Sequence, residues 1–508
     1  MARLYEYQGK RLLKSVGIPI PEGSPARSSE EARTIVEDIS APVVVKAQAW
    51  ITGRAGYGAI KFTDSPAGAA QAASELLGMQ IKSFIVDTVL VEEELDIERE
   101  FFASLIIDDQ TKSPVLIFSS RGGTGIEEIA QEDPDSVSKL VIDIREGLVD
   151  FQARDLVRST GIQGKLQLRI GTILTRLFHC ALQYDARSVE INPLVLTKDD
   201  KLVAADCRIT VDDYAVYRQP DLNIEVAREY DRPPTELEKI AWQIEKNDYR
   251  GTFYFIQMEQ GYGRGDGVIG FHGAGGGGSM MSMDAVLARS YRLADYVDTS
   301  GNPPASKVYR AAKIILAQDG IDGYFASGSG VASQEQFHSA RGLVKAFMEV
   351  PLTVPAVIRL GGNAEERAIA ILDRAADFIP APVEGYGKDD TPDFCAERLD
   401  FLIKEGQEGK ESITTRSQLP ATDAYTFKTV TDGTVILDHN ACRACESKIC
   451  IETCVPKILS LEDDVPVINI PLEKAEKGGC IECLACDIEC FFEGNRGGFV
   501  ILPIPGLE

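Results

Sequence analysis

The chain has 508 residues, the length of about three domains. Its 53 basic and 78 acidic side chains give a net charge of −25, which argues against binding to nucleic acids or anionic membranes, because both require a basic surface. The N-terminus has no signal-peptide pattern and no run approaches about 18 apolar residues, so we expect a cytoplasmic protein without a membrane span.

The first part of the chain alternates predicted strands and helices. Apolar, β-branched runs predict strands at 41–50, 84–95, 101–109 and 114–120. Helical spacing predicts helices over 134–144 and 164–184. Two further runs, 188–197 and 201–213, flank a short polar turn and predict a β-hairpin. We therefore expect an α/β domain over residues 1–235.

The sequence pattern changes at about residue 236. Strand–glycine–helix units repeat over 236–404 and predict a doubly wound parallel sheet. Residues 405–428 are polar and nearly aperiodic, so we expect a linker there. Residues 429–508 form a separate, cysteine-rich tail domain in this interpretation.

The segment 43–62 carries a candidate phosphate site. Lys46 ends a predicted strand, and a loop with three glycines begins at Gly53. An ammonium group and exposed backbone N–H groups together can bind a triphosphate, although a glycine-rich hairpin explains the same pattern. Glu92 and Glu100 lie near the end of a predicted strand, where a carboxylate can accept hydrogen bonds from ribose hydroxyls.

Asn192 and Asp206 lie on opposite strands of the predicted hairpin. An amide oxygen and a carboxylate that face each other provide the hard oxygen ligands that Mg²⁺ prefers. Taken singly, each acidic residue is also explained as a solvated surface charge. Their order along one chain is what favours a site for a magnesium–nucleotide complex.

The order of EYQGKRLL, VVVKAQ, GRAG, VEEELDI, EINPLV and YRQPDL resembles the beta subunit of succinyl-CoA synthetase and related ADP-forming acyl-CoA ligases, and the resemblance extends over about residues 1–400. It implies an ATP-grasp fold for 1–235, with ATP and Mg²⁺ as ligands. The nucleotide-binding residues that it implies are Lys46, Gly53, Arg54, Ala55, Glu92 and Glu100. Asn192 and Asp206 would hold Mg²⁺, and Glu190 would approach a phosphorylated histidine. Ala55 stands where the family commonly has glycine.

The stretch GFHGAGGGGSMM (270–281) contains a formal GxGxxG, the pattern of dinucleotide-binding turns. A tract this rich in glycine matches many such patterns by chance. The resemblance implies instead a flavodoxin-like CoA-ligase domain, in which this stretch lines a cleft for the carboxylate substrate and the phosphohistidine. His272 is then a candidate substrate-binding residue, or itself a phosphohistidine, since relatives usually carry asparagine there.

The stretch SGSGVAS (327–333) is expected to open the next helix. Backbone N–H groups of Gly328, Ser329 and Gly330, together with the helix dipole, would then hold an anion. The resemblance implies that this helix end faces the phosphohistidine, which makes the three residues candidate catalytic groups. Ser329 interrupts the paired glycines that are usual in the family.

Eight of the eleven cysteines fall in the last 67 residues, in two runs: Cys442, Cys445, Cys450, Cys454 and Cys480, Cys483, Cys486, Cys490. The second run has the spacing C-x2-C-x2-C-x3-C, in which three thiolates bind one cluster and the fourth binds its neighbour. This crossing predicts one [4Fe–4S] cluster on Cys442, Cys445, Cys450 and Cys490, and another on Cys454, Cys480, Cys483 and Cys486.

Over about residues 430–508 the tail resembles bacterial two-cluster ferredoxins, so a small ferredoxin-like iron–sulfur domain is expected. The first run departs from that pattern, because four residues separate Cys445 from Cys450 and a proline follows one place late, at Pro456. Two zinc sites, each held by four cysteines, are the alternative.

Together these patterns predict the beta-type subunit of an ADP-forming carboxylate–CoA ligase, an acid–thiol ligase. A histidine on a separate alpha subunit, which also binds CoA, would be phosphorylated by ATP and pass its phosphate to the acid, so we expect a hetero-oligomer. The tail would dock a redox partner protein, sense redox state or act as a fused carrier. The alternatives are an electron-transfer subunit whose ATP-grasp part drives or gates a redox reaction, and a scaffold with an inactive nucleotide site.

Overall fold

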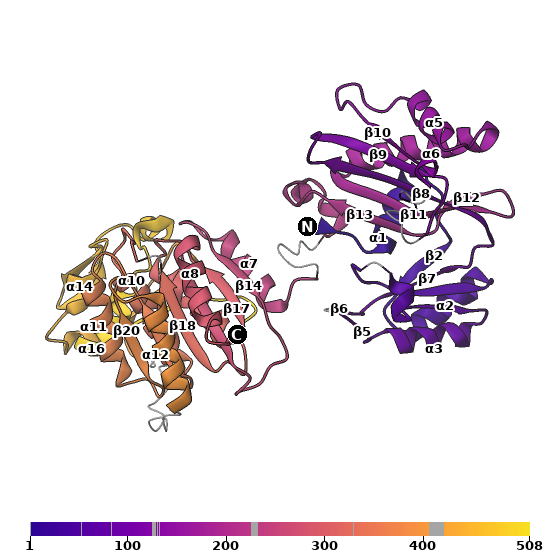
Figure 1. Ribbon diagram of the computed structural model, residues 1–508. Helices are drawn as coiled ribbons and strands as arrows, with labels where there is room; N and C mark the ends of the chain where they lie inside the picture. The colour runs from indigo at the N-terminus through magenta and orange to yellow at the C-terminus, as the bar shows by residue number, and fades with distance from the viewer. Residues whose placement is uncertain are drawn as a thin grey trace. The chain divides into compact units, whose positions relative to one another are not determined.

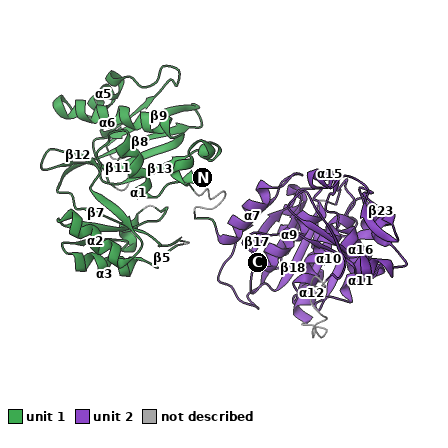
Figure 2. Cartoon of the chain, turned by 180° about the vertical axis from the view of Figure 1, so that it is seen from behind, with its two compact units in different colours: residues 1–234 green, residues 235–508 purple. Residues whose placement is uncertain are grey.

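The computed structural model of the chain describes residues 2–51, 53–82, 84–123, 129, 131, 133–224, 232–328, 330–405 and 421–507. The chain divides into two compact units, residues 1–234 and 235–508 (Figure 2). Among the helices in these described ranges, none combines the length and apolar character that a membrane crossing requires.

The first unit contains a large antiparallel sheet and a smaller one (Figure 1). The large sheet has the order β1 (Ala2–Arg3), β13 (Cys207–Val211), β11 (Ala186–Thr197), β8 (Ile97–Asp108), β9 (Ser113–Ser119) and β10 (Val137–Val141), with β12 (Leu202–Ala204) on β11. Its core is completed by α1 (Glu6–Ser15), α5 (Asp150–Ser159) and α6 (Gly164–Gln183). The amphipathic spacing of α6 explains this packing, since its apolar residues recur on one face.

The smaller sheet has the order β2 (Gly23–Ala26), β7 (Val89–Glu93), β3 (Val43–Ala47) and β4 (Ile60–Thr63). Helices α2 (Ser29–Ile39) and α3 (Pro66–Leu76) cover it and share its core. A short hairpin of β5 (Gln80–Ile81) and β6 (Phe84–Ile85) follows α3. Every residue of β3 is buried, as its unbroken apolar run predicts.

The helix expected over 134–144 is wrong. These residues form the 3₁₀ turn η2 (Pro134–Ser136) and strand β10, which pairs with β9 at the edge of the large sheet. The valine that ends β10, Val141, is 54% exposed, so the apolar spacing does not mark a buried helical face. The backbone hydrogen bonds that β9 offers at the sheet edge decide the conformation instead.

The second unit is built on a mostly parallel sheet. Its order is β14 (Tyr254–Gln257), β17 (Asp295–Asp298), β15 (Val268–Ala274), β18 (Gly323–Gly328), β19 (Ala356–Arg359) and β20 (Val383–Tyr386), with β16 (Arg292–Leu293) on β15. The parallel strands β15, β17, β18, β19 and β20 follow the spatial order 2-1-3-4-5, which is the flavodoxin-like doubly wound order. Only the edge strand β14 is antiparallel among the described strands of this path.

Helices cover both faces of this sheet. One face packs against α8 (Gly276–Leu287) and α12 (Pro392–Glu405). The other packs against α7 (Glu236–Lys246), α9 (Ala305–Leu316), α10 (Phe337–Glu349) and α11 (Glu365–Ala376). Burial on both faces explains the continuous apolar runs of its strands.

The cysteine-rich tail shares a hydrophobic core with the helices α9, α10 and α11 instead of standing apart (Figure 1). Its strands are β21 (Ala424–Lys428), β22 (Thr434–Asp438), β23 (Leu459–Glu462), β24 (Val465–Ile468) and β25 (Gly498–Ile501). Its helices are α13 (His439–Arg443), α14 (Ile449–Thr453), α15 (Leu472–Lys474) and α16 (Ala485–Glu493), with the π-turn η5 (Ala475–Gly479). Strands β21, β22 and β25 form one antiparallel sheet, and β23 and β24 form a hairpin.

The expected linker at 405–428 differs from the structure at both ends. Glu405 is the last residue of α12, and residues 424–428 form β21, which pairs with β22. The stretch 406–420 lies outside the described residues. Polar composition therefore marked the connection but not its limits, because β21 is an edge strand with exposed side chains.

Asp295 at the start of β17 is buried, and one of its carboxylate oxygens, Oδ2, has no hydrogen-bond partner in the described part of the chain. Burial raises the pKa of Asp295 to about 8. The folded state therefore keeps a proton that the unfolded state releases above about pH 4, so the free energy of unfolding falls as pH rises from about 4 to about 8. We expect Asp295→Asn to stabilise the protein at pH 8 by about 1–3 kcal/mol and to have little effect at pH 4. Urea denaturation at the two pH values measures this, and parallel stability profiles would contradict it.

Candidate functional site

Lys46, at the end of β3, lies in a buried network of ion pairs. Its Nζ atom is 3.0 Å from Oε1 of Glu6 and 2.5 Å from Oε1 of Glu92. It also donates a hydrogen bond to the carbonyl oxygen of Ala205, 2.9 Å away. The two carboxylates outweigh burial and raise the pKa of Lys46, so the side chain is a cation. The small sheet thus brings this cation to the connection between β12 and β13 of the large sheet.

Glu6 and Lys10, which complete this network, were missed by the sequence reasoning. Nζ of Lys10 lies 2.8 Å from Glu6 and 2.5 Å from Glu92. Burial alone would raise the pKa of Glu6, but Lys10, Lys46 and Arg54 outweigh it and hold that pKa well below its usual value. The sequence signals only their pairing with each other, because an acid and a base four residues apart share one face of a helix.

In the glycine loop the side chain of Arg54 is buried, while the backbone of the loop glycines faces free space. Gly53 and Gly58 have φ values of 70° and 68° and bracket the 3₁₀ turn η1 (Arg54–Tyr57). A Cβ atom at either glycine would meet nothing within 4 Å, so this backbone faces free space, as phosphate binding requires. Ala55 lies inside the turn and needs no positive φ, which explains why alanine can replace the glycine of the family there.

Arg54 joins the loop to the hairpin of the large sheet. Its Nη2 atom lies 2.8 Å from Oδ2 of Asp206 and 2.6 Å from Oε2 of Glu6. The side chain of Asp206 is 33% exposed, so one carboxylate edge remains accessible. Burial and Glu6 raise the pKa of Asp206, while Arg54 and the two lysines oppose them.

Asn192 on β11 and Asp206, the residue before β13, are neighbours across the two strands. Strand β11 pairs with β13 in a register that sets Ile191 against Cys207, and the backbone N–H of Asn192 donates to the carbonyl oxygen of Asp206 at 3.1 Å. Residues opposite one another in an antiparallel pair project from the same face, so both oxygen donors lie on one side of the sheet. Glu190 lies two residues before Asn192 on β11 and therefore shares that face.

Glu100 approaches the same region from β8. The backbone N–H of Gly123 donates to Oδ1 of Asn192 at 3.1 Å, and a Cβ atom on Gly123 would lie 3.4 Å from Oε2 of Glu100. Within the described residues, no three His, Cys, Asp or Glu side chains are arranged to hold a metal ion. Magnesium in nucleotide sites is usually bound through one or two protein oxygens plus phosphates, so this donor set fits Mg²⁺ that arrives with a nucleotide.

In the second unit, a helix begins directly after a glycine turn at the carboxyl end of β15. Gly275, with φ 89°, is the residue before α8, and its N–H donates to Oδ1 of Asp298 at 2.9 Å. The first turn of α8 is built of glycines, so its backbone N–H groups are not covered by side chains of their own. In doubly wound sheets ligands bind at this carboxyl edge.

His272 lies beneath that edge, within the core. It is 3% exposed, and its Nδ1 atom is 2.7 Å from the hydroxyl oxygen of Tyr324. Burial lowers the pKa of His272 to about 3, so the imidazole is neutral. A phosphorylated histidine has to be reached by its phosphate donor, and the structure therefore does not favour a phosphohistidine at this position.

The expectation that residues 327–333 open a helix is wrong. Gly328 is the last residue of β18, and α10 begins only at Phe337. The connecting loop is held across the sheet edge by hydrogen bonds, including one of 3.0 Å from the N–H of Gln334 to Oδ1 of Asn302. Gly328 thus ends a strand and Gly330 lies in the loop after it, neither of them at the start of α10, and Ser329 lies outside the described residues.

Arg359, at the end of β19, supports this loop. Its guanidinium group donates to the carbonyl oxygens of Gly328 at 3.0 Å and Lys388 at 3.1 Å. Gly330 has φ 76°, and a Cβ atom there would lie 2.9 Å from the same guanidinium group. A side chain at position 330 would therefore both strain the backbone and displace Arg359.

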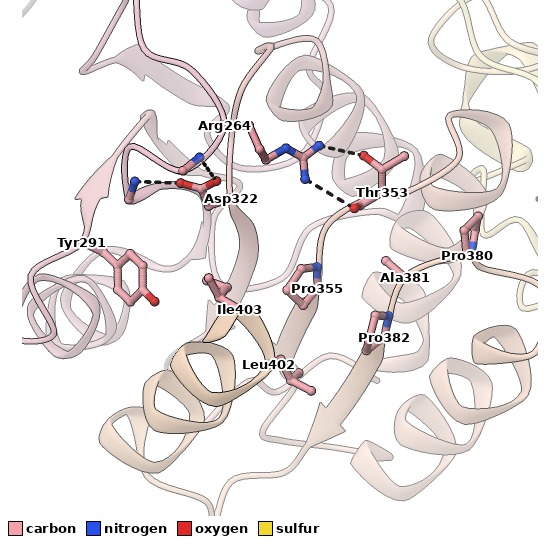
Figure 3. Close-up of a pocket in the computed structure, with 12 residues that line it drawn as sticks. Arg264, Tyr291, Asp322, Thr353, Pro355, Pro380, Ala381, Pro382, Leu402 and Ile403 are labelled. Carbon is pink, nitrogen blue, oxygen red and sulfur yellow. Dashed lines mark hydrogen bonds between the residues drawn. The ribbon is translucent and has the colours of Figure 1, made fainter. Parts of the chain in front are cut away.

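A cavity of about 620 Å³ lies at the opposite edge of the sheet (Figure 3). It is lined by residues that precede β15, β18, β19 and β20, together with Tyr291 and the end of α12. Asp322 there accepts hydrogen bonds from the backbone N–H groups of Gly265 and Gly267, and Arg264 donates to Thr353. Since these polar groups bind the protein's own chain, we do not assign the cavity a role in the reaction.

The tail cysteines line two cavities. One is lined by Cys442, Cys445, Cys450 and Cys490. The other is lined by Cys454, Cys480, Cys483 and Cys486. These are the two groups that the spacing predicts, including the exchange of the fourth cysteine between the runs. In each group three cysteines of one run and one cysteine of the other run line the same space.

Comparison with known proteins defines the class of the chain. The model of the ATP-grasp domain family matches residues 3–196, so the first unit contains an ATP-grasp domain. ATP citrate lyase of Methanothrix soehngenii, solved with citrate and coenzyme A, has a similar fold with a TM-score of 0.62 at 16% identity, over 80% of this chain and 99% of that chain.

Two curated relatives specify the family. The beta subunit of the GDP-forming succinate–CoA ligase of Thermus thermophilus is 36% identical over 75% of this chain and 96% of the relative. The ADP-forming counterpart of Chloroflexus aurantiacus is 36% identical over 76% of this chain and 97% of the relative. The chain belongs to the family of succinate–CoA ligase beta subunits, which confirms the expected enzyme class of acid–thiol ligases. About a quarter of the chain is not covered by either match.

Proposed function

We propose that the chain is the beta-type subunit of an ADP-forming carboxylate–CoA ligase that works with a separate, CoA-binding alpha subunit. The observation that carries this proposal is the meeting of Lys46 and Arg54 with Asp206, which lies in a distant segment of the chain. Together with Asn192 they supply two cations and two oxygen donors beside an open glycine loop. Phosphoryl transfer needs such groups, since its catalysis consists largely of positioning the phosphate and stabilising its charge.

The residues of this site have distinct roles in the proposal. Lys46 and Arg54 neutralise the charge of the triphosphate, while the backbone of Gly53 contacts its oxygens. Asn192 and Asp206 hold Mg²⁺, which neutralises the β- and γ-phosphate oxygens when bound. Glu92 and Glu6 keep the lysine ammonium in place before nucleotide arrives, because buried cations need paired carboxylates.

The glycine turn at the start of α8 is the proposed second site of the reaction. Backbone N–H groups at a helix N-terminus favour anions, and both the acid substrate and the phosphate on the partner's histidine are anions. Gly328 and Gly330 lie at the end of the neighbouring strand β18, so the two glycine segments flank one edge of the sheet. Transfer of phosphate to the acid and then displacement by CoA would take place there.

The assay that tests this function uses the chain with its natural partner subunit. We expect ADP release from ATP and Mg²⁺ to require both CoA and a carboxylic acid, and a panel of dicarboxylic and monocarboxylic acids identifies the substrate. Radioactive phosphate from ATP labelled at its γ-phosphate should appear on a histidine of the partner and be absent from this chain. ADP release that does not depend on acid and CoA would contradict the proposal.

We further propose that the two cysteine groups hold two [4Fe–4S] clusters and that the tail serves electron transfer to or from a docked redox protein. The grouping of four cysteines around each cavity supports this, because crossing ligation by two runs is typical of two-cluster domains. Thiolates around a single zinc ion would lie about 3.8 Å apart, given a Zn–S distance of about 2.3 Å. A [4Fe–4S] cluster instead places iron and sulfide between its four thiolates, so a measurement of iron and zinc content decides between the two.

The alternative function, ATP-controlled electron transfer, draws support from one observation. The tail and the ligase domain share a single hydrophobic core, so a change in one can reach the other. In that case reduction of the clusters by dithionite should change the rate of ATP hydrolysis in the complex. A ligase that uses the tail only for docking should release ADP at the same rate in both redox states.

A further inference from the structure

Helix α10 carries two charged side chains with no solvent exposure, Arg341 and Lys345, toward the tail helix α16. Nη2 of Arg341 lies 2.7 Å from Oε1 of Glu489. Nζ of Lys345 lies 2.8 Å from Oδ2 of Asp487. The two cations are four residues apart and thus share one face of α10. Breaking a buried pair leaves an uncompensated charge in the interior, so these contacts hold α16 on the ligase domain.

The acids of these pairs alternate with cluster-lining cysteines along α16. Asp487 follows Cys486, and Glu489 precedes Cys490, so each pair anchors a residue next to one of the two cysteine groups. Arg341 also reaches further, since its Nη1 atom donates to the carbonyl oxygen of Cys483 at 3.4 Å. The guanidinium group therefore contacts the backbone of the second cysteine group directly, while its partner Glu489 adjoins Cys490 of the first group.

The other charges around Arg341 have partners of their own. Glu489 is also bound by Arg367 at 3.4 Å and Arg374 at 3.1 Å. Glu482, in the same cysteine loop, lies 3.8 Å from Arg310 and accepts hydrogen bonds from Thr429 and Thr431. Removing Arg341 alone would therefore take one buried positive charge away from the Cys483 carbonyl, while Glu489 keeps Arg367 and Arg374 as partners.

We propose that Arg341 is a positioning residue for the second cluster: it holds the Cys483 loop in place and its buried positive charge makes that cluster easier to reduce. The inference rests on the clusters of the proposed function. On reduction, one electron from an external donor is added to the cluster and no bond to the protein changes. Because the cluster gains negative charge, a nearby cation in a medium of low dielectric constant stabilises the reduced form.

The test is a redox titration of the full-length chain, purified without oxygen and followed by electron paramagnetic resonance. Arg341→Gln should lower the reduction potential of one cluster and leave the other close to its wild-type value. Arg341→Lys should preserve the potential but release iron faster to a chelator, since an ammonium group cannot bind Glu489 and Cys483 together as the planar guanidinium does. The pair Arg341→Met with Glu489→Leu should return the potential toward the wild-type value, because it removes both charges.

The control is Arg398 of α12, the helix that covers the sheet face opposite the tail. Arg398 pairs with Glu384 at 2.6 Å. Arg398→Gln should leave both potentials and the iron content unchanged. An Arg341→Gln chain with two clusters at wild-type potentials would overturn the inference while the cluster proposal stands. A wild-type chain that holds no cluster after treatment with iron and sulfide would overturn both. A purely structural role would lower iron content in all Arg341 variants without a potential shift specific to one cluster.

Discussion

Replacing Lys46 with methionine is expected to lower the rate of ADP release by at least about 100-fold in the complex with the alpha subunit. The reason is that the Lys46 cation is held at the junction of the small sheet and the β12–β13 connection, where the triphosphate is proposed to bind. Methionine keeps the length and the apolar stem of the side chain but removes the charge. The measurement is coupled ADP release under saturating acid and CoA, together with labelling of the partner's histidine.

The matched control is Lys61 on the adjacent strand β4. Its side chain is 35% exposed and pairs with Glu75 at the surface, so Lys61→Met should leave ADP release within about twofold of wild type. Loss of Lys46 also leaves Glu6 and Glu92 with one cation fewer, and thermal unfolding must therefore show that the variant is folded at the assay temperature. A folded Lys46→Met variant with normal ADP release would exclude this site from the reaction.

Local sequence patterns predicted much of the first unit, because an apolar run and a polar turn are recognised from neighbouring residues alone. The buried strand β3 is an unbroken apolar run, and the hairpin around Asn192 and Asp206 is two apolar segments joined by a polar turn. Once such a hairpin is placed, the register brings the two oxygen donors together without further information. The nucleotide-site interpretation depended on this local step and on the order of motifs along the chain.

Long-range contacts were beyond the sequence. Glu6 and Lys10 lie on the first helix, and nothing local shows that they meet Lys46 and Glu92 from two other strands. The same holds for Arg341, whose partner Glu489 is 148 residues away. An amphipathic helix with a charged face is expected to present that face to solvent, and only the docking of the tail reverses this at α10.

The wrong predictions have a common cause. The periodicity of a segment does not show which neighbouring strand or loop will form hydrogen bonds with it. Residues 134–144 have helical spacing but lie beside the open edge of β9, so they pair as a strand. The stretch at 327–333 has the composition of a strand–helix turn, yet hydrogen bonds to Asn302 and Asn363 extend the loop before the helix begins. At the glycine turn before α8, the N–H of Gly275 also donates to Asp298, yet the helix begins at the next residue, as the pattern predicts.

Replacing Cys490 or Cys486 is expected to remove different clusters, although the two residues lie one turn apart on α16. Cys490 lines the cavity with Cys442, while Cys486 lines the other cavity with Cys454. We expect each alanine variant to fall from about eight to about four irons per chain, and the two variants to lose complementary parts of the electron paramagnetic resonance spectrum of the reduced protein.

The control for these variants is Cys395, which is buried in α12 on the far side of the sheet from the tail, so that Cys395→Ala should keep both signals. Elemental analysis of the same samples separates iron from zinc. If Cys490→Ala and Cys486→Ala lose the same signal, the crossing of the two cysteine runs is wrong. If all three proteins contain zinc and no iron, the electron-transfer role of the tail is excluded, because zinc does not change its oxidation state.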